Sequence, residues 1–544
     1  ALACGNTVLF KPSPLAFPLG AEIAKCFWDA GIPREALQLV SCEDGEPIQT
    51  LSGHHDVDAI IFTGGTQTAL KLLEKRPDAE LSAETGGKNA TIVTAMADRD
   101  QAIEHVLHSA FSHSGQKCSA TSLLVLEREV YEDKTFRRQL LDAIQTLKVG
   151  SVWNFSNKMG PLIREPLADL RKGLETLEPG AGTSGAESWA LQGKCDETNP
   201  KLWYPAVKWG VRRGSFSHQT EFFGPLLSVM RAESLEDAIE IVNDTDYGLT
   251  SGLESLDPRE QKIWMEKIKA GNLYINRVTT GAVVLRQSFG GMGLSAIGAG
   301  IKAGSPNYTV QFCRIEESAA PTQGPLREES SLHYLARNWQ SQLARNKDFS
   351  AEHPEEIRHE LQKTIQAIYS CLFQYEREFS GEQDFFRLRG QDNLFRYLPV
   401  GKVTVRLHPD DGLFETLIRI AAARIAKCKV EVSLPPELKN YVSEFLTGTE
   451  GKRLCDSVEI CTESDEELAE RFLITNMTSK IDRLRYAHPD RVPKTIHQAA
   501  AKLGKHISRH VPLAEGRIEM LRYLREQSIS VDYHRYGNLG EREV

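Results

Sequence analysis

The strongest constraint on the fold is the alternation of apolar strands and amphipathic helices in the first 85 residues. The segment "NTVLF" is typical of a buried strand, and "LGAEIAKCFWDAG" is typical of a helix that ends at Gly31. Two further strand segments, "ALQLVS" and "DAIIFTGG", lead into a second helix, "TQTALKLLEK". This order predicts an α/β fold in which helices cover a mostly parallel sheet.

A polar boundary and a long helix follow. Mixed elements continue to about residue 290, with "GNLYINR" a clear strand, and the proline- and glycine-marked segment 316–330 comes next. Beyond it, apolar residues recur at steps of three or four, and Pro354 with two glutamates opens the segment. We therefore expect a helix used for packing or dimerisation. Its apolar positions are Ile357, Leu361, Ile365, Ile368 and Leu372.

The last part of the chain returns to an α/β pattern and carries a faint internal repeat. Residues 423–436 and 457–465 resemble residues 2–14 and 59–66, respectively. The second copy lacks the lysine and the glycine pair of the first, so we interpret it as a duplicated fold whose ligand site has decayed. Two unrelated α/β segments remain the alternative.

Composition excludes several classes of protein. Lys and Arg number 65 and Asp and Glu 74, which gives a net charge of -9. The basic residues are dispersed along the chain, which argues against nucleic-acid binding. No apolar run reaches the ~18 residues of a membrane span. The start, "ALACGNTVLF", is too short and too polar for a signal peptide. It lacks an initiator Met and begins inside a pattern, so we expect further sequence upstream.

The cysteines are scattered and form no C-x-x-C pair, although the chain has 10 of them. This spacing predicts neither a disulfide framework nor a structural metal site, and it fits a reducing cytoplasm. We expect most of these thiols to be buried and inert.

Two short motifs lie where an open α/β sheet binds ligands. Lys11 follows the first strand, where an ammonium can donate to hydroxyl groups of a ligand, although a solvated lysine is the ordinary alternative. Gly64 and Gly65 precede a helix N-terminus that favours an anionic group. A plain tight turn explains the glycine pair equally well.

Two further motifs carry groups that can react. Glu84 opens "ETGGKN", and a carboxyl group in a tight, partly apolar turn can have a raised pKa and act as a general base. A surface glutamate is the alternative. Cys118 lies in "FSHSGQKCSA", where a backbone-rich turn can provide a nucleophile with thiolate character and access. An inert thiol remains open, whereas zinc is disfavoured because His113 is the one nearby partner.

Taken together, the motifs resemble the aldehyde dehydrogenase superfamily. "GNTVLFKPS", "FTGGT", "ETGGKN", "GQKCSA", "EFFGPLL", "YGLTSG" and "FGGMGLS" occur in family order over roughly residues 1–314. The segments "GNLYINRVTTGAVVLRQSFGGMGLSAIGAGIKAGSPNYTVQF" and "GQDNLFRYLPVGKVTVR" and the ending "LREQSISVDYHRYGNLG" narrow the resemblance. They are similar to the aldehyde dehydrogenase module and C-terminal domain of the bifunctional proline utilization A family.

The resemblance implies NAD-dependent oxidation of L-glutamate γ-semialdehyde to L-glutamate in proline catabolism. Cys118 would attack the aldehyde, and Glu84 would activate the water that hydrolyses the thioester. Lys11 and Glu221 would bind the two riboses of NAD, with Phe223 beside the nicotinamide. The pyrophosphate region would be lined by Gly64, Gly65 and Thr66.

The same resemblance assigns a substrate site without a metal. The substrate carboxylate would be held by Ser119 and by backbone N–H groups at Gly281 and Ala282, and Phe289 would flank the aliphatic part. Read alone, "TTGAVV" is an ordinary loop before a strand.

Three departures from the family qualify these roles. The oxyanion-hole asparagine of the family lies upstream of Ala1, Pro14 stands where relatives often have a ribose-binding glutamate, and Ala69 replaces a common glycine. A fragment active only in folding or assembly is therefore one alternative, and an enzyme for another semialdehyde, such as succinate semialdehyde, is another.

The resemblance also implies the organisation and partners of the chain. An upstream FAD-dependent proline dehydrogenase module, a homo-oligomer and a cytoplasmic location are expected. The implied parts are the C-terminal part of an NAD-binding Rossmann-like domain (1–85), a catalytic domain with the nucleophile and the substrate loop (86–291), a return segment (292–315), a linker with a helical segment (316–400), and a degenerate aldehyde-dehydrogenase-like α/β domain (401–544).

Overall fold

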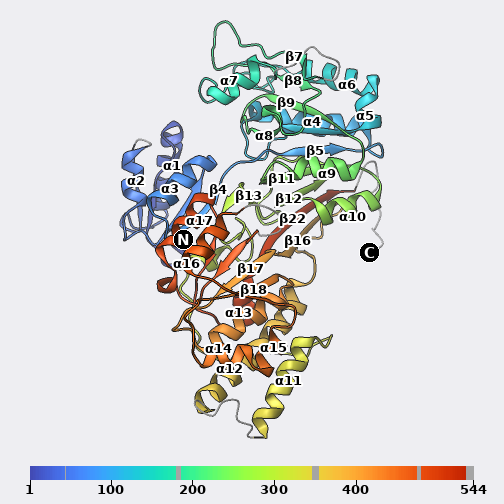
Figure 1. The fold of residues 1–544 in the computed structure, drawn as a ribbon. Helices are drawn as coiled ribbons and strands as arrows, with labels where there is room; N and C mark the ends of the chain where they lie inside the picture. Colours follow the sequence, from blue (N-terminus) through green and yellow to red (C-terminus); the bar gives the residue numbers. More distant parts are fainter. Residues whose placement is uncertain (43–44, 179–185, 346–353, 475–479, 534–544) are drawn as a thin grey trace.

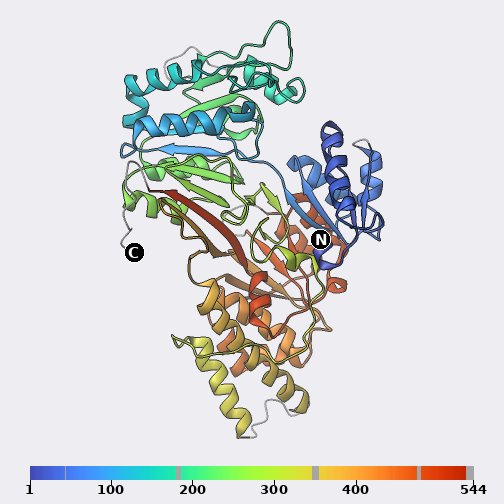
Figure 2. The same cartoon turned by 180° about the vertical axis from the view of Figure 1, so that it is seen from behind.

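The computed structural model describes residues 1–42, 45–178, 186–345, 354–474 and 480–533, and its largest element is one long sheet (Figures 1 and 2). Within these residues the sheet has ten strands, parallel at its centre and antiparallel at both ends. In spatial order they are β15 (Gln383–Asp384), β16 (Gln391–Pro399), β22 (Leu524–Asp532), β12 (Asn272–Ile275), β11 (Thr250–Glu254), β5 (Ala90–Val93), β6 (Leu123–Glu127), β9 (Leu226–Ala232), β8 (Ala206–Trp209) and β7 (Ser188–Leu191).

The central strands of this main sheet are apolar on both faces because helices cover both. In β6, Leu123 and Val125 pack with Trp264 and other residues of the helices on one face. The alternate residues, Leu124 and Leu126, pack on the other face. The helices of the first face are α9 (Leu235–Asn243) and α10 (Pro258–Lys267), and those of the second are α4 (Arg99–Phe111) and α6 (Lys134–Gln145). The α/β class expected from the sequence is confirmed.

The first 85 residues form the expected strands and helices, but not one sheet. β1 pairs with β2 in parallel, and β3 pairs with β4 in parallel in a separate sheet, which the antiparallel β14 closes on one side. The expectation of a single sheet here is wrong: β1 and β2 form a sheet of their own, and β4 pairs on one edge with β3 and on the other with a strand from far along the chain. The elements are β1 (Val8–Phe10), α1 (Phe17–Asp29), β2 (Leu37–Leu39), α2 (Glu46–Ser52), β3 (Ala59–Thr63), α3 (Thr66–Lys75), β4 (Glu80–Glu84) and β14 (Ala296–Ile297).

A second α/β unit occupies the C-terminal region, in orange and red in Figure 1. Its five described strands are all parallel in the order β19-β18-β17-β20-β21, so the chain winds outward in both directions from β17. The reversal of strand order lies between β17 and β20, which is where such sheets bind ligands. The elements are β17 (Lys402–Arg406), α13 (Leu413–Ile425), β18 (Lys429–Leu434), β19 (Glu459–Thr462), α16 (Asp465–Leu473), β20 (Arg483–Arg485), α17 (Lys494–Leu503) and β21 (Ile507–Ser508).

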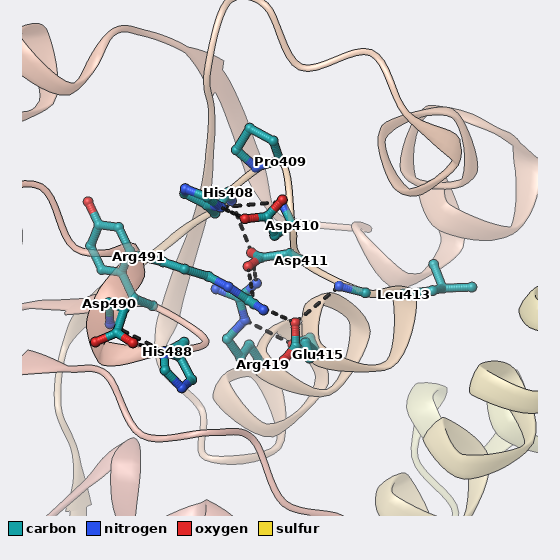
Figure 3. Close-up of polar contacts among 12 residues, drawn as sticks. His408, Pro409, Asp410, Asp411, Leu413, Glu415, Arg419, His488, Asp490 and Arg491 are labelled. Carbon is teal, nitrogen blue, oxygen red and sulfur yellow. Dashed lines mark hydrogen bonds and ion pairs between the residues drawn. The ribbon is translucent and has the colours of Figure 1, made fainter.

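The protein's own charged side chains fill that point of reversal (Figure 3). The Asp411 carboxylate contacts the guanidinium groups of Arg419 and Arg491, and Arg491 also donates to Glu415 at 2.6 Å. Glu360 accepts the Leu413 N–H at 2.6 Å at the start of α13. Carboxylates therefore take the helix N-terminus that an anionic ligand would use. The prediction that the C-terminal unit is a duplicate with a decayed ligand site stays a prediction. The charged side chains at the point of reversal support it.

The segment between the two units is helical, as expected. Helix α12 (Pro354–Gln374) packs beside α11 (Ser331–Ala344) and α13. All five apolar positions expected to face a core are at most 8% exposed, which confirms a packing helix. The division of the chain into domains stays a prediction, yet β16 and β22, from outside residues 86–291, complete the main sheet.

The cysteines are less buried than expected. All ten are free thiols, but Cys371 and Cys455 alone are buried, because most of the others lie at element ends or on outward faces. Cys26 of α1 and Cys313 are exposed. Among the described residues, no helix has the length and the apolar character needed to cross a membrane.

Candidate active site

Glu84 is the last residue of β4 and is held from two sides. Its backbone carbonyl accepts the Gly64 N–H at 3.1 Å, and its carboxylate Oε2 accepts the Gly291 N–H at 3.0 Å. Burial raises the pKa of Glu84 to about 7, although the Lys302 ammonium and the Gly291 N–H act in the opposite direction. The raised pKa expected for this residue is confirmed, and a carboxyl group with a pKa near 7 is suited to general base catalysis.

The nucleophile candidate follows a sharp turn after α4. His113, Ser114 and Gly115 all have positive φ angles, of 54°, 55° and 69°. A Cβ on Gly115 would lie 2.2 Å from the Gly224 carbonyl oxygen, so glycine is required there. The turn carries the chain from the end of a helix to Cys118 within a few residues, and Cys118 is partly buried.

The structure brings Cys118 and Glu84 together. Burial is the main cause that raises the pKa of the Cys118 thiol, and the nearby carboxylates of Glu84 and Glu221 raise it further. The N–H groups of Ser119 and of Cys118 itself point to the sulfur and lower the pKa, but they do not outweigh the other effects. The expected thiolate character is therefore wrong for this state. A protonated thiol needs a base to become a nucleophile, and a nearby carboxyl group with a pKa of about 7 is suited to that task.

One residue that the sequence did not single out, Asn89, fastens the two motifs to each other. Its Nδ2 donates to the carbonyl oxygens of Cys118 at 2.6 Å and Ala120 at 3.1 Å, and its Oδ1 accepts the Thr250 N–H at 3.0 Å. Asn89 is 3% exposed. In the sequence, its position at the end of "ETGGKN" was the one feature that could have pointed to Asn89. A buried amide that makes three hydrogen bonds fixes the nucleophile relative to the base.

The glycine pair and Thr66 lie at the N-terminus of α3, as expected. Gly65 caps the helix, and the first turn contains no acidic side chain. A Cβ added to Gly65 would meet no described atom within 4 Å, so the backbone is accessible there. The Thr66 hydroxyl donates to the Thr85 carbonyl oxygen at 2.8 Å and thus joins this helix to the Glu84 loop. An open, uncharged helix N-terminus fits a pyrophosphate.

Glu221 lies against the same loop. Its Oε1 accepts the Gly87 N–H at 2.8 Å, and burial raises its pKa to about 7 against the effect of that N–H and of the Lys88 ammonium. Phe223 is 44% exposed and has a φ of 55°. Lys11 directly follows β1 and is partly buried. Glu221 is thus close to Cys118, and the exposed ring of Phe223 lies two residues further along.

The proposed substrate residues approach the nucleophile turn through Thr279. The Thr279 hydroxyl donates to the Ser119 carbonyl oxygen at 3.0 Å, and Thr279 is 1% exposed. Ser119 itself is buried. Gly281 has a φ of 83° and is exposed, with no described atom within 4 Å of the position of a Cβ, and the partly buried Ala282 follows it. Its place in "TTGAVV" was the one sign in the sequence of an anchoring role for Thr279.

Phe289 lies on the strand-like segment that returns toward Glu84. Its backbone pairs with Ala303 through hydrogen bonds of 2.9 and 3.0 Å. Two residues further on, the Gly291 N–H donates to the Glu84 carboxylate. Phe289 is therefore two residues from the group that holds the base.

Two groups of side chains have metal-ligand chemistry in the described part of the chain. One is the exposed His54, His55 and Asp56, and the other is Glu431, Cys461 and Glu463. Arg471 bridges the second group, with its Nη2 at 2.7 Å from Glu431 and 2.6 Å from Glu463. The arginine supplies the positive charge that a cation would otherwise bring.

The part of the chain that carries this site resembles known proteins. The model of the aldehyde dehydrogenase family matches residues 1–317. A 1-pyrroline-5-carboxylate dehydrogenase of Bacillus subtilis (strain 168) is 31% identical over 318 residues, which are 57% of this chain and 60% of that protein. The chain thus spans about three fifths of the length of the curated relatives it matches.

Solved structures extend the similarity to the C-terminal region. Proline utilization A from Corynebacterium freiburgense superposes with a TM-score of 0.78 and 34% identity, covering 98% of this chain and 48% of that one. A 1-pyrroline-5-carboxylate dehydrogenase from Thermus with bound NAD has a TM-score of 0.52 and 34% identity, covering 57% of this chain and 60% of that one. The family match covers more than half of the chain, and the chain belongs to the aldehyde dehydrogenase family.

Proposed function

We propose that this chain is the aldehyde dehydrogenase part of an enzyme of the proline utilization A type, and that it oxidises L-glutamate γ-semialdehyde to L-glutamate. The observation that carries the proposal is that the partly buried Glu84 carboxylate lies close enough to the Cys118 thiol to raise its pKa. The names and the coverage of the similar proteins support the substrate.

The chemistry divides between the two residues. Glu84 or water removes the thiol proton and passes it to solvent, the Cys118 sulfur bonds to the aldehyde carbon, and the N–H of Cys118 stabilises the resulting oxyanion. NAD, when bound, supplies the acceptor for the hydride that leaves this carbon. Glu84 then takes a proton from water, the water oxygen attacks the thioester carbon, and the Cys118 thiolate leaves. The thiolate takes the proton back from Glu84, and the product acid releases its own proton to solvent, which leaves glutamate and the free enzyme thiol.

The residues near the site fit NAD. Gly64, Gly65 and the N-terminus of α3 suit its pyrophosphate, as described above. Lys11 and Glu221 are proposed for the ribose hydroxyls, and the exposed ring of Phe223 for the nicotinamide. The raised pKa of Glu221 is consistent with a carboxyl group that gains from additional hydrogen-bond donors.

The loop at residues 279–282 is proposed to hold the substrate carboxylate. Thr279 anchors the loop to Ser119, and the exposed, left-handed Gly281 leaves backbone N–H groups open for an anion. Ser119 adds a hydroxyl, Ala282 a second N–H, and Phe289 an apolar wall. Charge-assisted hydrogen bonds of this kind distinguish an amino acid semialdehyde from an uncharged aldehyde.

The partners belong to the same proposal. A proline dehydrogenase module that uses FAD would precede this chain in the full-length protein and deliver the substrate precursor. A homo-oligomer and a cytoplasmic location are proposed with it.

Substitution at the two reacting residues tests the function in the full-length protein, with NAD and pyrroline-5-carboxylate as substrates. In Cys118→Ala, NADH formation is expected to be lost. In Glu84→Gln, we expect one equivalent of NADH per active site, formed more slowly because water alone takes the thiol proton, and then turnover slowed on the order of 100-fold or more, because hydrolysis lacks its base.

The exposed Cys26→Ala is the matched control and should retain full activity. Turnover in Cys118→Ala at the rate of the unmodified enzyme would overturn the assignment of the nucleophile.

A further inference from the structure

A buried lysine lies beside the proposed general base and has no part in the chemistry described above. Lys302 is 2% exposed, and its Nζ donates to Asn272 Oδ1 at 3.1 Å and to the Gly290 carbonyl oxygen. Burial lowers the pKa of Lys302 to about 8, and the carboxylates of Glu84 and Glu526 oppose this shift. Burial of an ammonium group costs desolvation free energy, so a buried lysine at this position calls for a functional explanation.

The lysine reaches Glu84 through one peptide unit. The Gly290 N–H donates to Asn272 Oδ1 at 3.1 Å, so Lys302 and Gly290 share the same acceptor. The Gly291 N–H, on the other side of the Gly290 carbonyl, donates to Glu84 Oε2. Lys302 therefore fixes the carbonyl end of the peptide whose N–H end holds the base. The packing is close, since a Cβ on Gly290 would lie 2.8 Å from Glu84 Oε1.

The lysine is held in turn by a residue from the far end of the chain. Glu526 of β22 accepts the Lys302 N–H at 2.7 Å through Oε2 and the Asn307 Nδ2 at 2.6 Å through Oε1. Glu526 is 3% exposed, and β22 is paired with β12, the strand that carries Asn272. The C-terminal strand thus joins the hydrogen-bonded chain that ends at Glu84.

We propose that Lys302 and Glu526 are positioning residues for the general base, so that the C-terminal strand is a working part of the active site. The inference rests on the proposed role of Glu84. Lys302 has two effects: it orients the Gly290–Gly291 peptide, and its positive charge favours the ionised form of the carboxyl group that must accept a proton from water. Glu526 sets the position of the lysine backbone.

The test compares thioester formation with thioester hydrolysis in the full-length protein. In Lys302→Met, the initial NADH burst should remain, steady-state turnover should fall about tenfold or more, and the acidic limb of kcat should move to higher pH by about one unit. In Glu526→Gln, which loses one acceptor, a smaller change in the same direction is expected. If the NADH burst and the steady-state turnover fell by the same factor and the acidic limb of kcat did not shift, the role of these residues would be purely structural. That result would overturn the proposal.

Lys208→Met is the matched control. Lys208 is equally buried, and its Nζ lies 2.9 Å from Glu187 and donates to Ser217 Oγ at 3.1 Å, neither of which belongs to the Lys302 chain. This variant should lose stability without shifting the acidic limb of kcat. It therefore distinguishes an effect on folding from an effect on the position of Glu84. If Lys302→Met does not fold, Glu526→Gln decides, and an unchanged ratio of burst to turnover with an unshifted limb refutes the inference.

Glu84→Gln, measured in parallel, separates the two proposals. Normal turnover in Glu84→Gln would refute the proposed function itself. Impaired turnover there, combined with an unaltered Lys302→Met enzyme, would refute the inference alone.

Discussion

At the scale of single residues, the site is defined by carboxyl groups whose pKa values burial has raised. Glu84 and Glu221 both have a pKa of about 7, and both raise the pKa of the Cys118 thiol. The reacting sulfur is therefore protonated at neutral pH in this state. Activation depends on a neighbouring base rather than on the electrostatics of the turn, and this makes the pH dependence of the two half-reactions diagnostic.

We expect hydrolysis of the thioester to show an acidic limb near pH 7. The base must be ionised, and the ionised fraction of Glu84 falls about tenfold per unit below its pKa, so the hydrolytic rate should fall with it. The burst rate should instead keep rising above pH 7, because the thiol pKa is raised. Rapid-mixing measurements of NADH formation from pH 5.5 to 9 would resolve both. A limb close to the ordinary carboxyl value of 4.5 for hydrolysis would contradict the role of Glu84.

The residues proposed to react could be picked out from the sequence, because the residues that mark them are adjacent in the chain. Glu84 stands before a glycine pair, and Cys118 stands in a polar turn, so each motif shows its chemistry within a few residues. Lys302 and Glu526 could not be found in this way. A lysine in "IKAG" is ordinarily solvated, and its burial depends on a strand more than 200 residues away. Tertiary pairing, not local pattern, creates that part of the site.

At the scale of elements, β22 joins the C-terminal end of the chain to strands from its middle. It pairs in parallel with β12 and antiparallel with β16. Its residues Gln527 and Ser528 also donate to the carbonyl oxygens of Ala270 and Ser288 through their side chains. Helix α12 was predictable because the helical spacing of its apolar residues is visible within the segment itself. The position of β22 was not, since a strand pattern does not name its partner.

Truncation of a buried side chain in β22 should destabilise the main sheet. Ile529 is 0% exposed and packs with Leu273 and Ile275 of β12. Ile529→Ala should therefore lower the free energy of unfolding by about 2–5 kcal/mol, measured by urea denaturation. Ile460→Ala, on the 43% exposed Ile460 of β19, should change it by about 0.5 kcal/mol or less. Equal effects of the two substitutions would show that β22 does not belong to the core of the sheet.

At the scale of the whole molecule, the N-terminal and C-terminal α/β units meet along α3 and α17. Ala69 and Leu73 of α3 share a hydrophobic cluster with Ala501 of α17. Beside it, Arg509 pairs with Glu80 at 2.7 Å, and a cavity of about 30 Å³ is lined by both units. The contact is partly polar, which makes it sensitive to protonation.

Acid should weaken this contact through His497. Burial, assisted by the positive charge of Arg509, lowers its pKa to about 4, against the effects of Asp78 and the Pro77 backbone. Lys505 and His506 also line the cavity beside it. Below the ordinary value of 6.5, the unfolded chain binds a proton that the folded one does not. The stabilisation is thus complete above pH 6.5 and is lost as pH falls toward 4.

Between pH 7.5 and 5, the unfolding free energy of the unmodified protein should fall by about 2 kcal/mol more than that of His497→Gln. Urea denaturation at both pH values measures the difference. His55→Gln, at an exposed site, should behave like the unmodified protein. Identical slopes for all three proteins would show that His497 is not held neutral in the folded state.

On the ribosome, β22 is synthesised long after β12, the strand with which it pairs. Gln527 and the Ala270 carbonyl oxygen to which it bonds are 257 residues apart. At ~5–20 residues per second, translation leaves the flank of β12 uncovered for roughly 13 to 50 s. An uncovered strand flank is a template for unwanted pairing between nascent chains, so premature termination or slow decoding downstream of β12 should favour aggregation.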